Sequence, residues 1–152
     1  MPWISTTDYY DTGERVTEAY NLLKKTGLLE KLTPIASYKV DKEELIGFHS
    51  KEYIDKLEKF SNEDGGDVGE LCQIGKGGLD VIREAVGGDF NALDAVMSGK
   101  VQNAFCLQRS PAAHAERDRG FGFCVVNSFN ILIQRAREKY GLKRIMIIDI
   151  DN

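Results

Sequence analysis

Two carboxylates stand near the end of the sequence. Asp149 and Asp151 belong to the run R-I-M-I-I-D-I-D, with one residue between them. If this run is a β-strand, its side chains alternate with a period of two, so both carboxylates leave it on the same side. Two converging carboxylates form a hard anionic pocket that suits a cation. A pair of solvated acids ending a strand is the alternative interpretation.

A second group of reactive residues lies in the stretch P-A-A-H-A-E-R-D-R-G-F-G-F-C. His114 is one of two histidines in the chain, and an imidazole exchanges protons near neutral pH. Gly122 lets the backbone approach a ligand closely, and Phe123 beside it could wall a narrow apolar channel. A lone histidine is more often a surface or satisfied residue, so the prediction of an acid/base site depends on these neighbours.

The surrounding pattern predicts the elements that would position both groups. Residues 144–150 are nearly all apolar, as in a central parallel strand covered on both faces. Residues 103–107 predict another buried strand, followed by a long polar loop over 108–126 and a helix over 127–140. Strand, loop, helix and strand form a βαβ unit, which predicts a three-layer α/β/α fold with a mostly parallel sheet. Ligands bind beyond the carboxyl ends of such strands, so the two groups should share one cleft.

The N-terminal half is predicted to be mainly helical. Apolar residues at helical spacing indicate a helix over 11–25 and another that Ser50 caps. Residues 33–40 read as a short extended segment, and residues 61–69 as a loop. Two further helices are predicted, over 78–86 and 91–97.

Composition narrows the functional class. The 152 residues suffice for one domain, and a formal charge of −4 disfavours a nucleic-acid-binding surface. We expect no membrane association, because no apolar run approaches the length of a membrane helix and the N-terminus lacks the pattern of a signal peptide. Three cysteines without a C-x-x-C pair favour reduced thiols and a cytoplasmic location.

The stretch from Asn103 to Asp151 resembles the histone deacetylase superfamily, in particular its class II and bacterial amidohydrolase members. The family pattern is R-P-P-G-H-H-A-E, then G-F-C-x-x-N, then a strand ending D-x-D-x-H-H-G. This chain has R-S-P-A-A-H-A-E, G-F-C-V-V-N and D-I-D at the same places. Weaker likeness through L-E-K-L-T-P-I, F-H-S-K-E-Y-I and G-K-G-G-L-D-V-I-R-E-A-V-G-G extends it to most of the chain after Glu14. The resemblance implies an arginase/deacetylase fold.

It also implies roles for individual residues. Asp151 corresponds to the family's first zinc ligand, and Asp149 to a carboxylate that supports the site and helps to bind a monovalent cation. His114 matches the second of the tandem histidines, the general base and acid. Gly122 and Phe123 match the lining of the acyl-lysine tunnel. The implied reaction is hydrolysis of an acetyl amide with Zn²⁺ as cofactor.

Further matches are less regular. Arg15 resembles the arginine below the foot of the tunnel. Glu70 stands where the family uses an aspartate to hold the substrate backbone, and Asp67 is an alternative for that role. Ala113 replaces the first histidine of the tandem, which removes an imidazole expected to tune the metal-bound water.

The zinc-binding histidine, the second aspartate and the catalytic tyrosine of the family would follow Asn152. We therefore expect residues 1–152 to be the N-terminal part of a single deacetylase-like domain, with an incomplete fold and weak or no zinc binding, because a catalytic zinc site needs three protein ligands. The strand over 144–150 would be an exposed apolar edge, which predicts homo-oligomers or pairing with a missing C-terminal half.

Two functional interpretations stay open. The first is a deacetylase of acetyl-lysine or acetylpolyamines that is inactive by itself. The second is a non-catalytic, self-associating binding module, which Ala113 favours. A haloacid-dehalogenase-type phosphohydrolase also has a D-x-D strand end, but that motif normally opens its domain, and the His114 stretch has no place in it.

Overall fold

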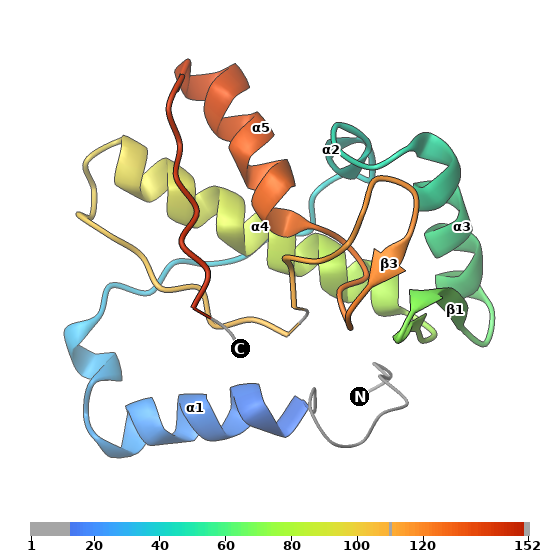
Figure 1. Cartoon of the computed structure of the whole chain (residues 1–152). Helices are drawn as coiled ribbons and strands as arrows, with labels where there is room; N and C mark the ends of the chain where they lie inside the picture. Colours follow the sequence, from blue (N-terminus) through green and yellow to red (C-terminus); the bar gives the residue numbers. More distant parts are fainter. Residues whose placement is uncertain (1–12, 110, 151–152) are drawn as a thin grey trace.

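The computed structural model describes residues 13–109 and 111–150 (Figure 1). Helices predominate in this part of the chain, and the strands are short. The elements in chain order are α1 (Gly13–Lys25), η1 (Leu29–Lys31), α2 (Glu43–Ile46), α3 (Lys51–Asn62), β1 (Gly66–Glu70), β2 (Cys72–Ile74), α4 (Gly78–Met97), β3 (Gly120–Phe121) and α5 (Ser128–Tyr140).

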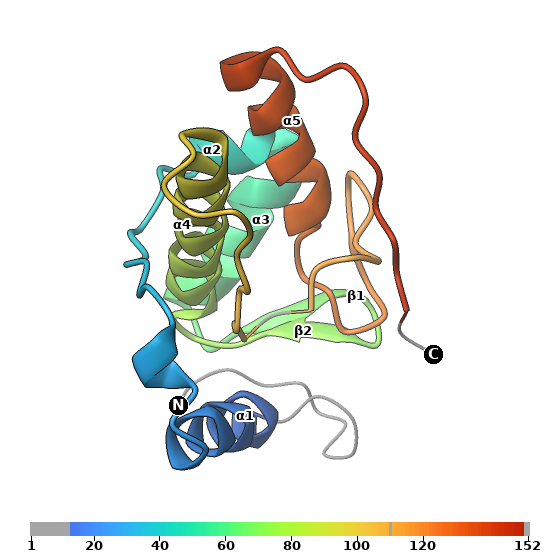
Figure 2. The same ribbon diagram turned by 90° about the vertical axis from the view of Figure 1, so that its left-hand side faces the viewer.

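Helix α4 is the centre of the packing. It packs against both α3 and α5, and β1 and β2 lie at one end of this helical group (Figures 1 and 2). Its side chains Ile82, Val86 and Phe90 are at most 1% exposed, and α3 contributes Ile54 and Leu57 at 0%. Burying one such side chain stabilises the fold by roughly 1.5–3 kcal/mol, so this cluster fixes the helices on which the rest is built.

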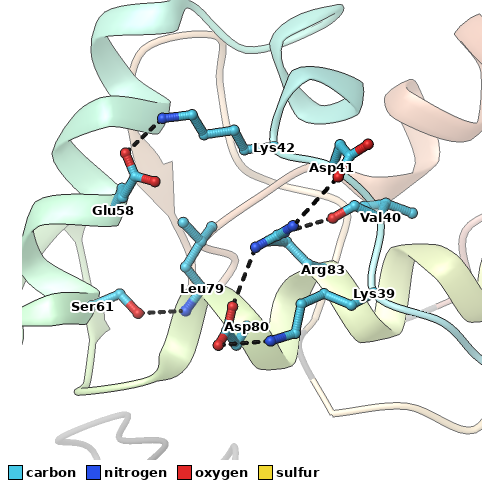
Figure 3. Close-up of polar contacts among 9 residues, drawn as sticks. All are labelled: Lys39, Val40, Asp41, Lys42, Glu58, Ser61, Leu79, Asp80 and Arg83. Atoms are coloured by element: carbon cyan, nitrogen blue, oxygen red, sulfur yellow. Dashed lines mark hydrogen bonds and ion pairs between the residues drawn. The ribbon is translucent and has the colours of Figure 1, made fainter.

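The predicted helix break between residues 86 and 91 is wrong, because α4 runs through it without interruption. Gly87 is there for close approach: a Cβ at this position would lie 1.7 Å from the carbonyl oxygen of Tyr38. The segment 33–40 therefore packs directly on α4. It is anchored by Arg83, whose Nε donates to the carbonyl of Val40 at 2.6 Å (Figure 3).

A hydrogen bond also joins the end of α3 to the start of α4. Ser61, at the end of α3, accepts a hydrogen bond from the backbone N–H of Leu79 at 3.0 Å, and Glu58 forms an ion pair with Lys42 at 2.6 Å (Figure 3). The serine hydroxyl satisfies one of the N–H groups that the first turn of α4 leaves without an intrahelical partner. The strands β1 and β2 connect α3 to α4. These contacts therefore also fix where the two strands lie relative to the helices.

The strands form a sheet in the order β2-β1-β3, with β1 antiparallel to β2 and parallel to β3. The predicted loop over 61–69 is wrong at both ends, because residues 61–62 belong to α3 and residues 66–69 to β1. A glycine in this stretch is needed for close approach of the strands. A Cβ on Gly69 would lie 1.8 Å from the carbonyl oxygen of Gly120, so glycine is what lets β3 pair with β1.

Neither of the predicted buried strands, 103–107 and 144–150, forms in the described residues. Residues 144–150, which we call the C-terminal segment, leave α5 and run apart from the helices (Figure 2). Met146, Ile148 and Ile150 are 81%, 77% and 92% exposed, and Phe105 is 75% exposed. A buried strand requires ladder partners and a cover on both faces, and β1, β2 and β3 supply neither to these segments.

Other predictions are confirmed. Helix α1 falls within residues 11–25, Ser50 caps α3 by accepting from the backbone N–H of Tyr53 at 3.3 Å, and α5 matches the predicted helix over 127–140. Gly141 ends α5 with a φ of 66°, a backbone conformation that glycine adopts readily. No helix in the described ranges is both long and apolar enough to cross a membrane.

Candidate functional site

The site is built on a sharp turn that follows β3. Phe121 and Cys124 exchange backbone hydrogen bonds at 3.1 and 2.9 Å, which closes the turn around Gly122 and Phe123. Both turn residues have positive φ, 52° and 68°. For a phenylalanine this conformation costs roughly 1–2 kcal/mol, and such strain is concentrated at binding and catalytic sites.

Pairing of β3 with β1 brings this turn to Glu70. The N–H of Gly122 donates to the carbonyl of Glu70 at 3.1 Å, next to the paired residues Glu70 and Phe121. Two predicted substrate-binding positions, Glu70 and Gly122, are therefore adjacent, with the Glu70 side chain exposed. Asp67 has a local contact instead: its Oδ1 accepts from the N–H of Gly69 at 3.0 Å, at the bulge of β1.

The predicted general base lies against the same turn. A Cβ on Gly122 would be 3.2 Å from Cδ2 of His114, so glycine at this position leaves room for the imidazole. The His114 and Phe121 rings form a T-shaped pair with their centroids 6.4 Å apart, and the histidine is exposed to solvent. His114, Gly122, Phe123 and Glu70 thus lie around one turn, and their roles in proton transfer and substrate binding stay predictions. An accessible imidazole beside this turn can transfer protons to and from a bound molecule.

Asn127 holds this arrangement from behind. We call residues 113–127 the histidine loop. The side-chain Nδ2 of Asn127 donates to the carbonyls of Ala113 at 2.8 Å and Ala115 at 3.1 Å, the two residues that flank His114. Its Oδ1 accepts from the N–H of Asn130 at 3.1 Å and caps α5. One buried amide therefore joins the backbone around His114 to the start of a helix.

His49 provides a second anchor that sequence reasoning missed. It is 0% exposed, its Nε2 lies 3.0 Å from the backbone N of Asn127, and its Nδ1 lies 3.2 Å from the carbonyl oxygen of Arg117. Burial lowers the pKa of His49 below its ordinary value and keeps the ring neutral. The signal was the motif F-H-S-K-E-Y-I, in which a histidine directly precedes the cap residue of a helix.

Two side chains of opposite charge, Arg119 and Glu116, lie beside the turn. Arg119 binds Glu116 through two hydrogen bonds at 3.0 and 2.8 Å, and its guanidinium lies 5.8 Å from the centre of the Phe121 ring. The hydrogen bond from Arg119 lowers the pKa of Glu116, and Glu116, with a smaller contribution from Glu70, raises the pKa of Arg119. Because these groups are exposed, they affect the local field more than stability.

A buried acid lies where the chain enters the loop region. Asp89, on α4, is 6% exposed and accepts a hydrogen bond from Nε2 of Gln108 at 3.1 Å. Burial raises the pKa of Asp89. Sequence reasoning missed this residue too, because an acid between glycines and a phenylalanine gives no sign that it faces the interior.

The predicted metal ligands are not assembled in the described residues. Asp149 is exposed on the C-terminal segment, and Asp151 lies outside the described residues. The end of the described chain lies apart from β3 (Figure 1). Within 13–109 and 111–150 no group of three or more histidine, cysteine or acidic side chains is placed to hold a metal ion. Arg15 is exposed on α1, so its predicted role stays a prediction.

The fold and the histidine loop together define an α/β protein of the arginase/deacetylase type, as the sequence predicted. The solved structure of the HDA15 HD domain matches with a TM-score of 0.78 and 23% identity over 83% of this chain and 36% of that one. The model of the histone deacetylase domain matches residues 10–152. The chain therefore belongs to the histone deacetylase family.

Curated relatives point the same way. The chain is 30% identical over 131 residues to the histone deacetylase-like amidohydrolase of Pseudomonas aeruginosa, covering 86% of this chain and 34% of that protein. It is 33% identical over 144 residues to the polyamine deacetylase HDAC10 of Mus musculus, covering 91% of this chain and 22% of that protein. The chain thus spans about a third or less of the length of these relatives.

Proposed function

We propose that this chain supplies the proton-transferring part of an active site that hydrolyses acetyl-lysine or acetylpolyamine amides. The contact between the His114 ring and Gly122, beside Glu70, carries this proposal. The names of the relatives, one an amidohydrolase and others polyamine deacetylases, support the substrate class.

In this proposal His114 takes a proton from the water that attacks the acetyl carbonyl and returns it to the leaving amine. Its exposure gives the water and the substrate access. The turn at Gly122 and Phe123 lines the path of the acyl chain, and the carboxylate of Glu70 accepts a hydrogen bond from the substrate backbone. A positioned general acid and base contributes roughly 10²–10⁴-fold to such reactions.

Zinc binding needs more than the described residues offer. The predicted zinc ligand, Asp151, lies outside the described residues, and Asp149 is predicted to support the site rather than to bind the zinc. A catalytic zinc site uses three protein ligands. We propose that this chain alone binds Zn²⁺ weakly, and that a monovalent cation near Asp149 likewise requires additional ligands. Metal analysis after gel filtration tests this, because one tightly retained zinc per chain would contradict it.

A chimera tests the catalytic proposal. Residues 10–152 would replace the matching part of the Pseudomonas amidohydrolase, and hydrolysis of an acetyl-lysine peptide and of acetylspermidine would be measured with zinc. We expect no turnover by residues 1–152 alone, turnover by the chimera, and a loss of at least about 100-fold in the H114A chimera. The matched variant A113H restores the missing imidazole and should raise turnover. A folded chimera whose turnover H114A leaves unchanged would contradict the proposal.

The alternative is a non-catalytic, self-associating module. Two observations favour it: Ala113 in place of the first family histidine, and the exposed apolar side chains of the C-terminal segment. Such a segment can add as a strand to another copy or to a separate partner. A folded chimera that binds zinc but hydrolyses neither substrate, even as A113H, would favour this alternative, and sedimentation of the chain would measure its self-association.

A further inference from the structure

A second histidine of the chain is buried behind the first. His49 lies between α2 and α3, 0% exposed, with the Phe48 and Tyr53 rings 4.8 and 5.3 Å from its own. A fully buried imidazole must have its polar atoms satisfied, because an unsatisfied buried group costs roughly the free energy of a lost hydrogen bond. Both ring nitrogens of His49 are within hydrogen-bond distance of the histidine loop.

The partners of His49 determine which nitrogen carries the proton. A backbone N–H can only donate, so Nε2 of His49 must accept from Asn127, at 3.0 Å. In a neutral ring the proton is then on Nδ1, which donates to the carbonyl of Arg117 at 3.2 Å. The two bonds require a single tautomer. The opposite tautomer would set two N–H donors against each other at Asn127 and leave the Arg117 carbonyl facing a lone pair.

Asn127 extends this connection to His114. The residue whose N–H binds His49 is also the one whose side-chain amide donates to the carbonyls of Ala113 and Ala115. The path from His49 to the backbone on both sides of His114 therefore runs through one residue. It consists of hydrogen bonds among buried or half-buried groups, where solvent competes little.

The neighbours of His49 attach the rest of the loop. The backbone N–H of Ser50 donates to the carbonyl of Arg117 at 3.1 Å, and Nη1 of Arg117 donates to the carbonyl of Phe48 at 3.2 Å. The hydroxyl of Tyr53 donates to the carbonyl of Val125 at 2.7 Å. Residues 48–53 thus hold the loop on both sides of the Gly122 turn.

We propose that His49 is a positioning residue that fixes the histidine loop through its Nδ1–H tautomer, and that Asn127 transmits this constraint to the backbone at His114 and so orients the imidazole. The consequence for catalysis rests on the proposed function, whereas the positioning itself does not. His49 touches no reacting atom in this proposal. Its effect is on where the His114 imidazole lies relative to Gly122.

The tautomer is measured directly by ¹⁵N NMR of the histidine rings in the whole chain. With two histidines in the sequence, the spectrum holds two sets of ring signals. We expect His49 to have a protonated Nδ1 and an unprotonated Nε2 at pH 7.5. A protonated Nε2, or rapid averaging between the tautomers, would overturn the proposal, and this result does not depend on any activity.

Two substitutions at His49 test the transmission. His49→Leu removes both hydrogen bonds, while His49→Gln keeps one donor and one acceptor. In H49L we expect hydrogen exchange of the Asn127 amide to accelerate by about tenfold or more, the equivalent of one buried hydrogen bond, and the His114 and Gly122 resonances to shift. H49Q should recover part of both effects.

Leu57→Ala is the matched control, because it removes volume from the core at 0% exposure without removing a hydrogen bond to the loop. Equal effects of L57A and H49L on Asn127, Gly122 and His114 would overturn the proposal. If H49L fails to fold, the tautomer of the unmodified chain and the H49Q spectrum decide. A confirmed tautomer together with an H114A-insensitive chimera would leave the positioning intact and reject the proposed function alone.

Discussion

The histidine loop and the C-terminal segment both carry residues that the sequence assigned to one active site, yet they are built in opposite ways. The histidine loop is exposed at His114 but attached by hydrogen bonds to the segment between α2 and α3, to α3 itself and to α5. The C-terminal segment is more apolar, and its side chains are mostly exposed. A region of the first kind is held by polar contacts within the described residues. A region of the second kind acquires its structure from ladder partners and a cover, which the described residues do not supply.

The largest expected effect is at Asn127, where the histidine loop depends on one side chain. Asn127→Ala removes the donors to Ala113 and Ala115 and the cap of α5. We expect the free energy of unfolding, measured by urea denaturation, to fall by about 3 kcal/mol, since a buried carbonyl without a partner costs about 1–3 kcal/mol and a lost cap about 1 kcal/mol.

Asn91→Ala is the control for this change. The Asn91 amide also donates to a backbone carbonyl, that of Ala36 at 2.8 Å, but near solvent. Its loss should cost about 1 kcal/mol or less. Equal losses for the two variants would mean that the histidine loop is no better anchored than a surface segment, and the contrast with the C-terminal segment would weaken.

A smaller effect is expected at the turn against His114. Gly122 and Gly141 both have positive φ, 52° and 66°, so alanine at either position should cost roughly 1–2 kcal/mol in unfolding free energy. They differ in surroundings: a Cβ at Gly122 would meet the His114 ring at 3.2 Å, whereas one at Gly141 would have nothing within 4 Å. Only G122A should shift the His114 ring resonances in NMR spectra. A similar shift in G141A would contradict the contact.

The sequence predicted the elements that local rules determine. Ser50 at the start of α3 and Gly141 at the end of α5 follow capping preferences that act within a few residues. The helix break predicted between residues 86 and 91 was wrong, because Gly87 lies within α4 and leaves room for a neighbour from another part of the chain, the Tyr38 carbonyl. The loop predicted over 61–69 was wrong at Gly69 for a similar reason, because its strand partner, Gly120, is far away in sequence.

The candidate site divides in the same way. The motif around His114, Gly122 and Phe123 was visible in the sequence, and the structure brings these residues together. His49 and Asn127 stand in the motifs F-H-S-K-E-Y-I and G-F-C-V-V-N, but these motifs do not show which distant backbone groups the two residues bind, so they were not recognised as supports. Residues 144–150 have the apolar composition of a central strand. That composition indicates a need for ladder partners and for a cover on both faces, but it does not indicate which residues supply them.

The pH dependence of stability tests the same anchoring with a smaller expected effect. Because burial lowers the pKa of His49, the unfolded chain takes up the proton first as pH falls. The stabilisation from the neutral ring is therefore complete above about pH 6.5 and is lost as pH falls below it toward the lowered pKa, by at most about 1.4 kcal/mol per pH unit for one group.

Urea denaturation of the unmodified chain and of H49Q, between pH 7.5 and 5.5, measures this slope. Arg117 and Asp118, whose charges act on His49, are present in both proteins. The raised pKa of the buried Asp89, also present in both, changes stability with pH in the opposite direction. The comparison with H49Q isolates the histidine. If both proteins lose the same stability on acidification, a group other than His49 is responsible.

The smallest effect on stability is expected in the C-terminal segment, and there the readout is association. Ile148→Lys changes a side chain that is 77% exposed, so the free energy of unfolding should move by no more than about 0.5 kcal/mol. Self-association measured by sedimentation should fall, because a charge on an edge strand opposes pairing with another chain. Tyr20→Lys, at a position 51% exposed on α1, adds the same charge elsewhere and should leave association unchanged.

A loss of stability above about 1 kcal/mol in I148K would show instead that the segment packs within its own chain, because exposed substitutions do not carry that cost. The exposed apolar side chains of the C-terminal segment would then not indicate a partner. Both regions would be anchored within the chain, the histidine loop by polar contacts and the C-terminal segment by apolar ones.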